Sequence, residues 1–173
     1  NHEMCVECGA CRAACPFGAI DERSSIVPVI MSIKTGSKVI AMVAPSIVGQ
    51  FGLKVKADQI YTALKMAGFA DVVEVAIGAD IVSVEEAEEY IEKVPAKQPF
   101  MTSSCCPAFV NIVKKYVPDA ADKVSHTVSP MVATGRWLKE QYPDATTVFI
   151  GPCIAKKGEA KGYPEYIDYV LTF

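Results

Sequence analysis

The chain has 173 residues, of which 51% are hydrophobic and 21% charged, and its formal net charge is −3. The length predicts one domain of ordinary size with a small appendage, and the composition excludes a disordered chain. The slight negative charge argues against a nucleic-acid partner. The longest charge-free stretch, Val39 to Leu53, is too short to cross a bilayer of roughly 30 Å, and no secretory signal is visible. We therefore expect a cytoplasmic protein with no membrane partner.

The N-terminal residues hold four of the seven cysteines, Cys5, Cys8, Cys11 and Cys15, followed by Pro16. This C-x2-C-x2-C-x3-C-P spacing is the bacterial ferredoxin pattern for a [4Fe–4S] cluster. In two-cluster ferredoxins the fourth cysteine of such a run ligates the other cluster. The sequence thus leaves open whether Cys15 completes this cluster or one held by residues upstream. A zinc site or oxidised thiols are the alternative to a cluster.

A polar hinge follows the cysteine run. Phe17–Asp21 predicts a short strand, and Asp21–Ser25 is polar. We place a domain boundary here, with a ferredoxin-like [4Fe–4S] segment over residues 1–25 and a second domain over residues 26–173.

Apolar runs and helical patterns alternate through the rest of the chain. Strands are expected at Lys38–Ala44, Asp71–Ile77, Phe100–Ser103, Thr146–Ile150 and Tyr169–Phe173. Helices are expected at Ala57–Ala67, Val84–Val94, Pro107–Val117 and Pro130–Tyr142. This alternation predicts an α/β fold, in which a parallel sheet is flanked by helices. The many glutamates of residues 84–94 are expected to form a solvated face.

The remaining cysteines follow two of the expected strands. Cys105 and Cys106 come after Ser103, and Cys153 comes shortly after Ile150. Ligands of open parallel sheets bind at the carboxyl ends of the strands. The pattern therefore predicts a metal site there, although any single free cysteine can simply be a small buried hydrophobe.

Two segments resemble signatures of the catalytic domain of [FeFe]-hydrogenases. Residues 102–109 read Thr-Ser-Ser-Cys-Cys-Pro-Ala-Phe, similar to the family's Thr-Ser-Cys-Cys-Pro-x-Trp. Residues 151–159 read Gly-Pro-Cys-Ile-Ala-Lys-Lys-Gly-Glu, similar to Met-Pro-Cys-x-x-Lys-x-x-Glu. The resemblance implies an enzyme that interconverts protons, electrons and H2 at a di-iron H-cluster. It also implies that electrons arrive from ferredoxin or another low-potential carrier through [4Fe–4S] clusters.

The resemblance implies roles for the residues of these signatures. Cys106 and Cys153 would be two of the four thiolates that hold the catalytic [4Fe–4S] cubane. Cys105 would pass protons to the di-iron unit. Lys156 would donate a hydrogen bond to a diatomic ligand on iron, a task suited to a compact ammonium group.

A proton path is also implied by the resemblance. Glu86 and Glu89 fit its two glutamates best, provided that one residue is deleted between them and the first signature. Ser125 falls at the position of its serine, and Glu159 matches the acid of the second signature. Groups within hydrogen-bond reach of one another are what proton delivery to a buried metal requires.

The chain departs from the family pattern at several positions. Two serines, Ser103 and Ser104, replace one, while Phe109 replaces Trp and Gly151 replaces Met. These changes resemble a divergent branch of the family. They keep open a non-catalytic iron–sulfur assembly protein, a redox or hydrogen sensor, or a simple electron-transfer module as alternatives.

The family's third signature, Glu-x-Met-x-Cys-x-x-Gly-Cys, is absent from the sequence. Because the chain also lacks an initiator Met and closes on an expected strand, we expect a fragment that needs the remainder of its own chain. Alone, it is expected to evolve no hydrogen. His126 is expected to be a satisfied strand-end residue, His2 is uninformative, and Trp137 and Met131 are expected to pack in the core.

Overall fold

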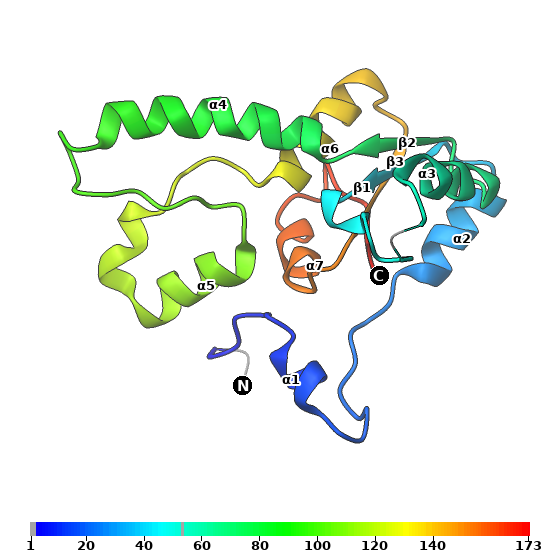
Figure 1. Cartoon of the computed structure of the whole chain (residues 1–173), viewed down its shortest axis with the longest axis horizontal. Helices are drawn as coiled ribbons and strands as arrows, with labels where there is room; N and C mark the ends of the chain where they lie inside the picture. The colour runs from blue at the N-terminus through cyan, green and yellow to red at the C-terminus, as the bar shows by residue number, and fades with distance from the viewer. Residues whose placement is uncertain (1–2, 53) are drawn as a thin grey trace.

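A computed structural model describes residues 3–52 and 54–173, so His2 lies outside the described residues. The described residues form a parallel sheet in the order β2-β1-β3-β4 (Figure 1). Its strands are β1 (Val39–Val43), β2 (Asp71–Glu74), β3 (Thr146–Gly151) and β4 (Tyr169–Thr172). Nearly every residue of β1 and β3 is buried, as expected for central strands covered on both faces. The predicted α/β fold with a parallel sheet is confirmed.

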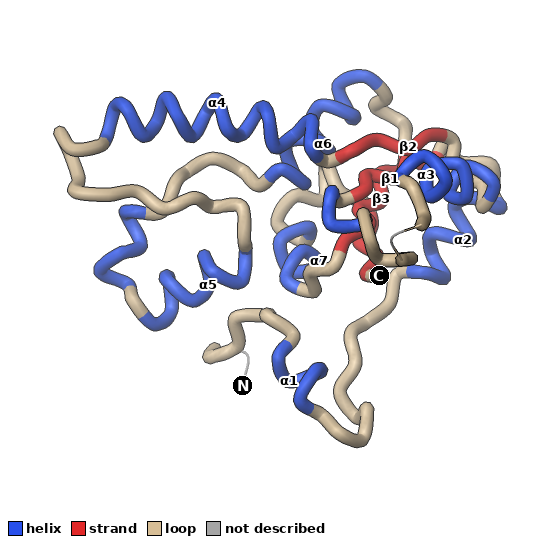
Figure 2. The backbone as a smooth tube through the Cα atoms, in the orientation of Figure 1, coloured by secondary structure: helices blue, strands red, loops and turns tan. Residues whose placement is uncertain are grey.

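Helices lie on both faces of this sheet and beyond its edge (Figure 2). They are α1 (Ala10–Ala14), α2 (Ile26–Lys34), α3 (Ala57–Met66), α4 (Ala76–Lys93), α5 (Pro107–Tyr116), α6 (Pro130–Gln141) and α7 (Ala155–Ala160). Two 3₁₀ turns, η1 (Pro45–Ile47) and η2 (Pro118–Lys123), complete the elements. Within residues 3–52 and 54–173, no helix has both the length and the apolar character needed to cross a membrane.

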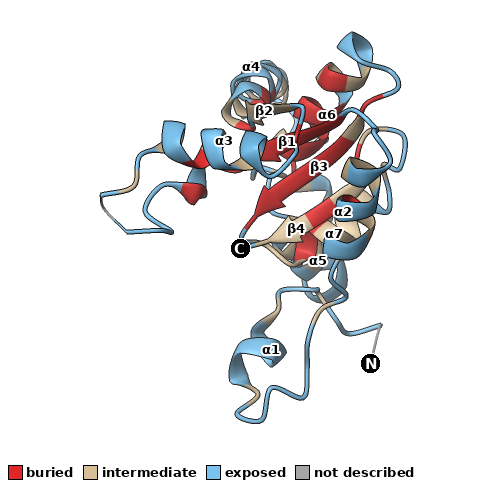
Figure 3. Ribbon diagram, turned by 90° about the vertical axis from the view of Figure 1, so that its right-hand side faces the viewer, coloured by how far each residue is buried: buried red, intermediate tan, exposed pale blue. Residues whose placement is uncertain are grey.

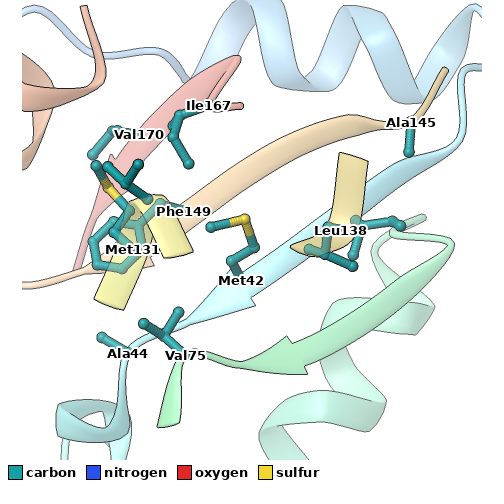
Figure 4. Close-up of a cluster of buried hydrophobic side chains, with 11 residues drawn as sticks. Met42, Ala44, Val75, Met131, Leu138, Ala145, Phe149, Ile167 and Val170 are labelled. Carbon is teal, nitrogen blue, oxygen red and sulfur yellow. The ribbon is translucent and has the colours of Figure 1, made fainter. Parts of the chain in front are cut away.

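The core has two halves, because alternate side chains of a strand point to opposite faces. One half packs α6 onto the sheet and is drawn in Figure 4; it includes Ile40, Met42, Phe149, Met131 and Leu138. The other half packs α2 and α3 onto the opposite face; it includes Val39, Val43, Val148, Val29 and Ile60. Met131 is buried and Trp137 packs against the first half, so both are core residues as predicted.

The chain between β2 and α6 forms an arm that extends from the sheet (Figures 1 and 2). Helix α4 leaves the sheet alongside α6, and the chain returns through a loop and α5. Gly78 makes the close approach of α4 to α6 feasible, since a Cβ there would lie 2.3 Å from the carbonyl oxygen of Pro130. The N-terminal cysteine segment lies mostly exposed beside α5 and α7 (Figures 1 and 3).

The strand predicted at Phe100–Ser103 is wrong. Thr102 makes only an isolated parallel bridge with Val124, outside the sheet. Phe100 is exposed, so the stretch is not covered as the central strands of the sheet are. Cys105 and Cys106 therefore do not follow a strand of the sheet, whereas Cys153 does follow β3.

The boundary between the second strand and the next helix is also different from the prediction. Strand β2 ends at Glu74, and α4 begins at Ala76 instead of Val84. Gly78, the residue after the expected strand, lies inside the helix, where α6 packs against it. The predicted helix 84–94 is thus the second half of an 18-residue helix.

Two further differences concern residues 17–34. Residues 17–21 form no strand, and helix α2 was not predicted. Pro28 lies in the first turn of α2, where a missing N–H costs no hydrogen bond. The domain boundary after Ser25 stays a prediction, although the polar segment before it does connect α1 to α2.

Candidate active site

The N-terminal cysteine segment is held against the arm by hydrogen bonds to its backbone. From α5, Lys115 Nζ donates to the carbonyl of Cys5 at 2.7 Å, and Tyr116 Oη donates to the carbonyl of Met4 at 2.7 Å. On its other side, Gly9 adopts a φ of 80° and lies against Ile154, just before α7. These contacts fix the loop that carries the first three cysteines.

The four N-terminal cysteines have the chemistry of cluster ligands. All four are free thiols, and Cys5, Cys8 and Cys11 are exposed. Backbone N–H groups of the four residues 17–20, above all that of Phe17, lower the pKa of Cys15, which favours the thiolate that ligates iron. Among the described residues, no three His, Cys, Asp or Glu side chains converge on the position of a single metal ion. The fit to a [4Fe–4S] cluster rests on four free thiols at the C-x2-C-x2-C-x3-C spacing.

Cys8 lies in the same hollow as Cys153. This hollow has a volume of ≈ 660 Å³, and Pro152 and Ile154 also line it. Cys153 lies in the C-terminal part of the chain and was predicted as a ligand of the catalytic cubane. The structure therefore brings the cysteine segment next to one predicted ligand of the second cluster.

Lys156 joins the two signature segments. Its Nζ donates to the carbonyl of Cys105 at 3.1 Å and to Glu159 Oε2 at 2.7 Å. Ser129 Oγ donates to the same carboxylate oxygen at 3.0 Å. Lys156 is only 8% exposed, and a charge so well buried needs a partner, which Glu159 supplies.

A line of oxygen atoms connects the two predicted glutamates of α4. Ser125 Oγ donates to Glu89 Oε2 at 2.6 Å and lies 2.9 Å from Thr127 Oγ1. Thr127 Oγ1 in turn donates to Glu86 Oε1 at 3.2 Å. The line runs Glu89–Ser125–Thr127–Glu86, with each step within hydrogen-bond distance.

The inner end of this line reaches the first signature. The backbone N–H of Ser104, one of the two serines that depart from the family pattern, donates to Glu86 Oε1 at 3.1 Å. Ser104 Oγ also donates to the carbonyl of Thr127 at 2.5 Å. The next residue is Cys105, whose Sγ lies 3.6 Å from Ser103 Oγ. Glu86 is thus anchored to the residue that precedes the cysteine predicted to pass protons.

The outer end of the line meets the surface at His126 and Lys93. Lys93 Nζ lies 2.6 Å from Glu89 Oε1, and His126 Nδ1 lies 2.8 Å from the same oxygen. Burial raises the pKa of Glu89, but the hydrogen bonds from Lys93, Ser125 and His126 outweigh it and lower that pKa to about 2. Glu89 is therefore ionised throughout the physiological range.

The structure divides the predicted site residues into two groups. Glu86, Glu89 and Ser125 lie on the oxygen line, whereas Glu159 belongs to a separate cluster with Lys156. Sequence reasoning missed Thr127, His126 and Lys93. His126 does not end a strand, so that part of its prediction is wrong, but its backbone N–H and its ring are hydrogen-bonded to Glu89, as expected of a satisfied residue. One signal in the sequence could have identified Lys93, because it follows Glu89 by four positions on a predicted helix, and such residues lie side by side.

Gly151, which departs from the second signature, is explained by its neighbours. A Cβ at this position would lie 2.6 Å from the ring of Phe149 and 3.1 Å from Cβ of Ala44. Glycine is therefore the residue that this end of β3 accommodates, and the ring of Phe149 occupies the adjacent space.

Comparisons with known proteins identify families for both parts of the chain. Residues 37–173 match the family described as the C-terminal domain of the iron only hydrogenase large subunit, and residues 1–21 match the 4Fe-4S binding domain. The chain belongs to the iron-only hydrogenase large-subunit family. The prediction that the N-terminal cysteines form a ferredoxin-like 4Fe–4S segment agrees with the second match.

Individual relatives of this hydrogenase-family chain are longer than it is. It is 34% identical to iron hydrogenase 1 of Clostridium pasteurianum over 84% of its own length and 28% of that protein. It is 33% identical to the periplasmic [Fe] hydrogenase large subunit of Nitratidesulfovibrio vulgaris, over 92% of this chain and 50% of the relative. A solved [FeFe]-hydrogenase chain, from work on oxygen damage to the 2Fe subcluster, aligns with a TM-score of 0.76 at 23% identity. That alignment covers 87% of this chain and 45% of the solved one, and it shows the fold.

Proposed function

We propose that this chain forms part of an enzyme that catalyses 2H⁺ + 2e⁻ ⇌ H2. The observation that carries the proposal is the line Glu89–Ser125–Thr127–Glu86, which runs from the surface to the residue before Cys105. Two hydroxyls between two carboxylates, with each step within hydrogen-bond reach, are an arrangement that proton transfer requires.

The number of hydrogens on this line suits the transfer of single protons. Between Glu89 and Glu86 there are three oxygen-to-oxygen steps, and the hydroxyls of Ser125 and Thr127 supply two hydrogens. One further proton therefore fills every step, and the two hydroxyls can rotate to pass it on. In this mechanism Cys105 exchanges protons between Glu86 and the reacting centre, across the turn that Ser104 anchors.

Lys156 has a positioning role and a binding role. Its ammonium carries three donors; two bind the carbonyl of Cys105 and the carboxylate of Glu159. We assign the third to a diatomic ligand of the di-iron unit. Glu159, itself held by Ser129, keeps the ammonium oriented.

The cysteines divide between two metal groups. Cys5, Cys8, Cys11 and Cys15 would hold a [4Fe–4S] cluster, while Cys106 and Cys153 would be two of the four thiolates of the catalytic cubane. The clusters supply one-electron transfer, and the di-iron H-cluster supplies the bond chemistry of hydrogen. Since this sequence offers two thiolates for a cubane that needs four, we propose that the chain alone does not turn over hydrogen.

The electron donor and the location follow from the same chemistry. We propose ferredoxin or another low-potential carrier as the electron partner, because Cys5, Cys8 and Cys11 are exposed. A reducing cytoplasm would keep seven free cysteines available to metal. Cell fractionation tests this placement, since the Nitratidesulfovibrio vulgaris relative is periplasmic.

Two measurements test the proposal. Protein purified without oxygen should contain iron and acid-labile sulfide, with an EPR signal of reduced [4Fe–4S] that Cys8→Ser weakens; zinc in place of iron would contradict the cluster. The whole protein encoded by the gene should evolve hydrogen from reduced viologen once its metal centres have been assembled. In that protein Glu86→Gln should slow evolution at unchanged iron content.

A second candidate function is a redox or hydrogen sensor of the same fold. Phe109 and Gly151 favour it, because they change two positions of the family signatures next to the predicted cubane ligands. A matured protein with its full iron content but negligible turnover would support the sensor over the enzyme.

A further inference from the structure

His126 lies where the proton line meets solvent. Its imidazole is 71% exposed, whereas the carboxylate that it contacts, Glu89, is only 13% exposed. The backbone N–H of His126 also donates to Glu89, at 3.1 and 3.2 Å to its two oxygens. The imidazole is therefore held beside the outermost member of the line while its far side faces water.

Two side chains compete for one nitrogen of this imidazole. Lys93 Nζ lies 2.8 Å from His126 Nδ1, and Glu89 Oε1 lies 2.8 Å from the same atom. Nδ1 accepts from Lys93 only while it carries no proton, and it donates to Glu89 only while it carries one. These two arrangements exclude each other, so the protonation state of the ring selects between them.

We propose that His126 is the surface proton carrier of the line, taking protons from water at Nε2 and passing them from Nδ1 to Glu89, with Lys93 occupying Nδ1 after release. This inference rests on the proposed function. One proton enters at Nε2 as another leaves Nδ1, and no electron moves. The ring is then the Nε2–H tautomer, and exchange with water at its exposed side, with Nε2 giving up a proton and Nδ1 regaining one, restores the Nδ1–H tautomer before the next transfer. Reversal of the step carries protons outward during hydrogen oxidation.

The charges around the ring favour this assignment. Glu89 is too acidic to store a proton near neutral pH, whereas an imidazole gains and loses one between about pH 5 and 8. The titratable groups that contact the ring are Glu89 and Lys93, both from α4; Glu86 lies two hydroxyls further along the line.

Imidazole NMR tests the coupling without any turnover. In ¹⁵N-histidine-labelled protein, the His126 resonance is assigned as the one lost in His126→Gln. We expect Glu89→Gln to move the titration midpoint to lower pH and Lys93→Gln to move it to higher pH, each by about 0.5 unit or more. Lys97→Gln, which removes the exposed partner of Glu92, is the matched control and should leave the midpoint in place. Equal midpoints in all four proteins would overturn the proposal.

Chemical rescue tests proton transfer itself. In the matured protein as its gene encodes it, His126→Gly should reduce hydrogen evolution about 10-fold at neutral pH, and added imidazole should restore it. Wild-type rates in the variant, or a loss that imidazole does not restore, would overturn the proposal. If the wild-type protein evolves no hydrogen, the proposed function fails, while the NMR result still decides whether His126, Glu89 and Lys93 form one titrating unit.

Discussion

Ser125 Oγ donates a 2.6 Å hydrogen bond to Glu89 Oε2 across 36 residues of sequence. This bond ties the segment before α6 to the outer half of α4. Together with Lys93 and His126, it satisfies a carboxylate that is only 13% exposed. The stability of the arm and the proton line therefore depend on the same residue.

Glu89 should contribute to stability at neutral pH and lose that contribution in acid. The pKa of Glu89 is about 2 in the fold, below its ordinary value of 4.5, so the stabilisation is complete above about pH 4.5 and is lost as pH falls toward 2. Glu89→Gln should lower the free energy of unfolding by roughly 2 kcal/mol at pH 6 and by much less near pH 2.5. Urea unfolding at several pH values measures this.

A matched control for that experiment lies on the same helix. Glu92 also has a lowered pKa, through its hydrogen bond with Lys97, but the pair is largely exposed and Glu92→Gln should change stability little. Parallel pH profiles for wild type and Glu89→Gln would contradict the account of Glu89.

Gly78→Ala should destabilise the protein although the site is helical. In an exposed helix this change stabilises by about 1 kcal/mol. Here the new Cβ would lie 2.3 Å from both the carbonyl oxygen of Pro130 and Thr134 Oγ1, so we expect a loss of about 2 kcal/mol. Ser83→Ala, at an exposed position of α4, is the control, and thermal unfolding distinguishes the two. A stabilised Gly78→Ala protein would show that α4 does not pack closely on α6.

Lys156 and Glu159 should be coupled. Removing one partner leaves a buried charge without compensation, so Lys156→Met or Glu159→Gln alone should cost about 3 kcal/mol. The double variant should be less unstable than the sum of the two by 1 kcal/mol or more, a range of about 1–3 being usual for direct contacts. Urea unfolding of all four proteins gives this difference. Strict additivity would mean that the 2.7 Å contact contributes nothing.

The sequence predicts elements well where local pattern and packing agree. Helix α3 was predicted within one residue, because its apolar face and the glycine just after it, Gly68, are visible in the local sequence. Residues 100–103 form no strand of the sheet, since a strand depends on a neighbouring strand that sequence periodicity does not reveal. The start of α4 was missed for a similar reason, because only the contact with α6 makes Gly78 favourable inside this helix.

The candidate site shows a similar division. The cysteines and Lys156 belong to recognisable motifs, the cysteine run and the two signature segments. Their residue types and spacing therefore predict metal binding. Thr127 and His126 carry no such motif, and their roles depend on α4 lying beside them in space. Their separation from Glu86 and Glu89 along the chain hides a contact that only the fold creates.

Thr127 should be required for fast proton transfer. Thr127→Val keeps the size of the side chain but removes the hydroxyl that joins Ser125 to Glu86. We expect hydrogen evolution by the matured protein to fall by about 10-fold or more, with restoration in Thr127→Ser. Iron content should be equal in all three proteins. Wild-type rates in Thr127→Val would mean that protons bypass this hydroxyl.

The most direct test of the whole account compares Cys105→Ala with Ser103→Ala in the matured protein as its gene encodes it. Both side chains lie at the inner end of the proton line, with Ser103 Oγ 3.6 Å from the Cys105 thiol, but only Cys105 is assigned the last proton transfer. We predict that Cys105→Ala retains its iron and sulfide yet loses hydrogen evolution, while Ser103→Ala retains both. Full hydrogen evolution by Cys105→Ala would contradict the account.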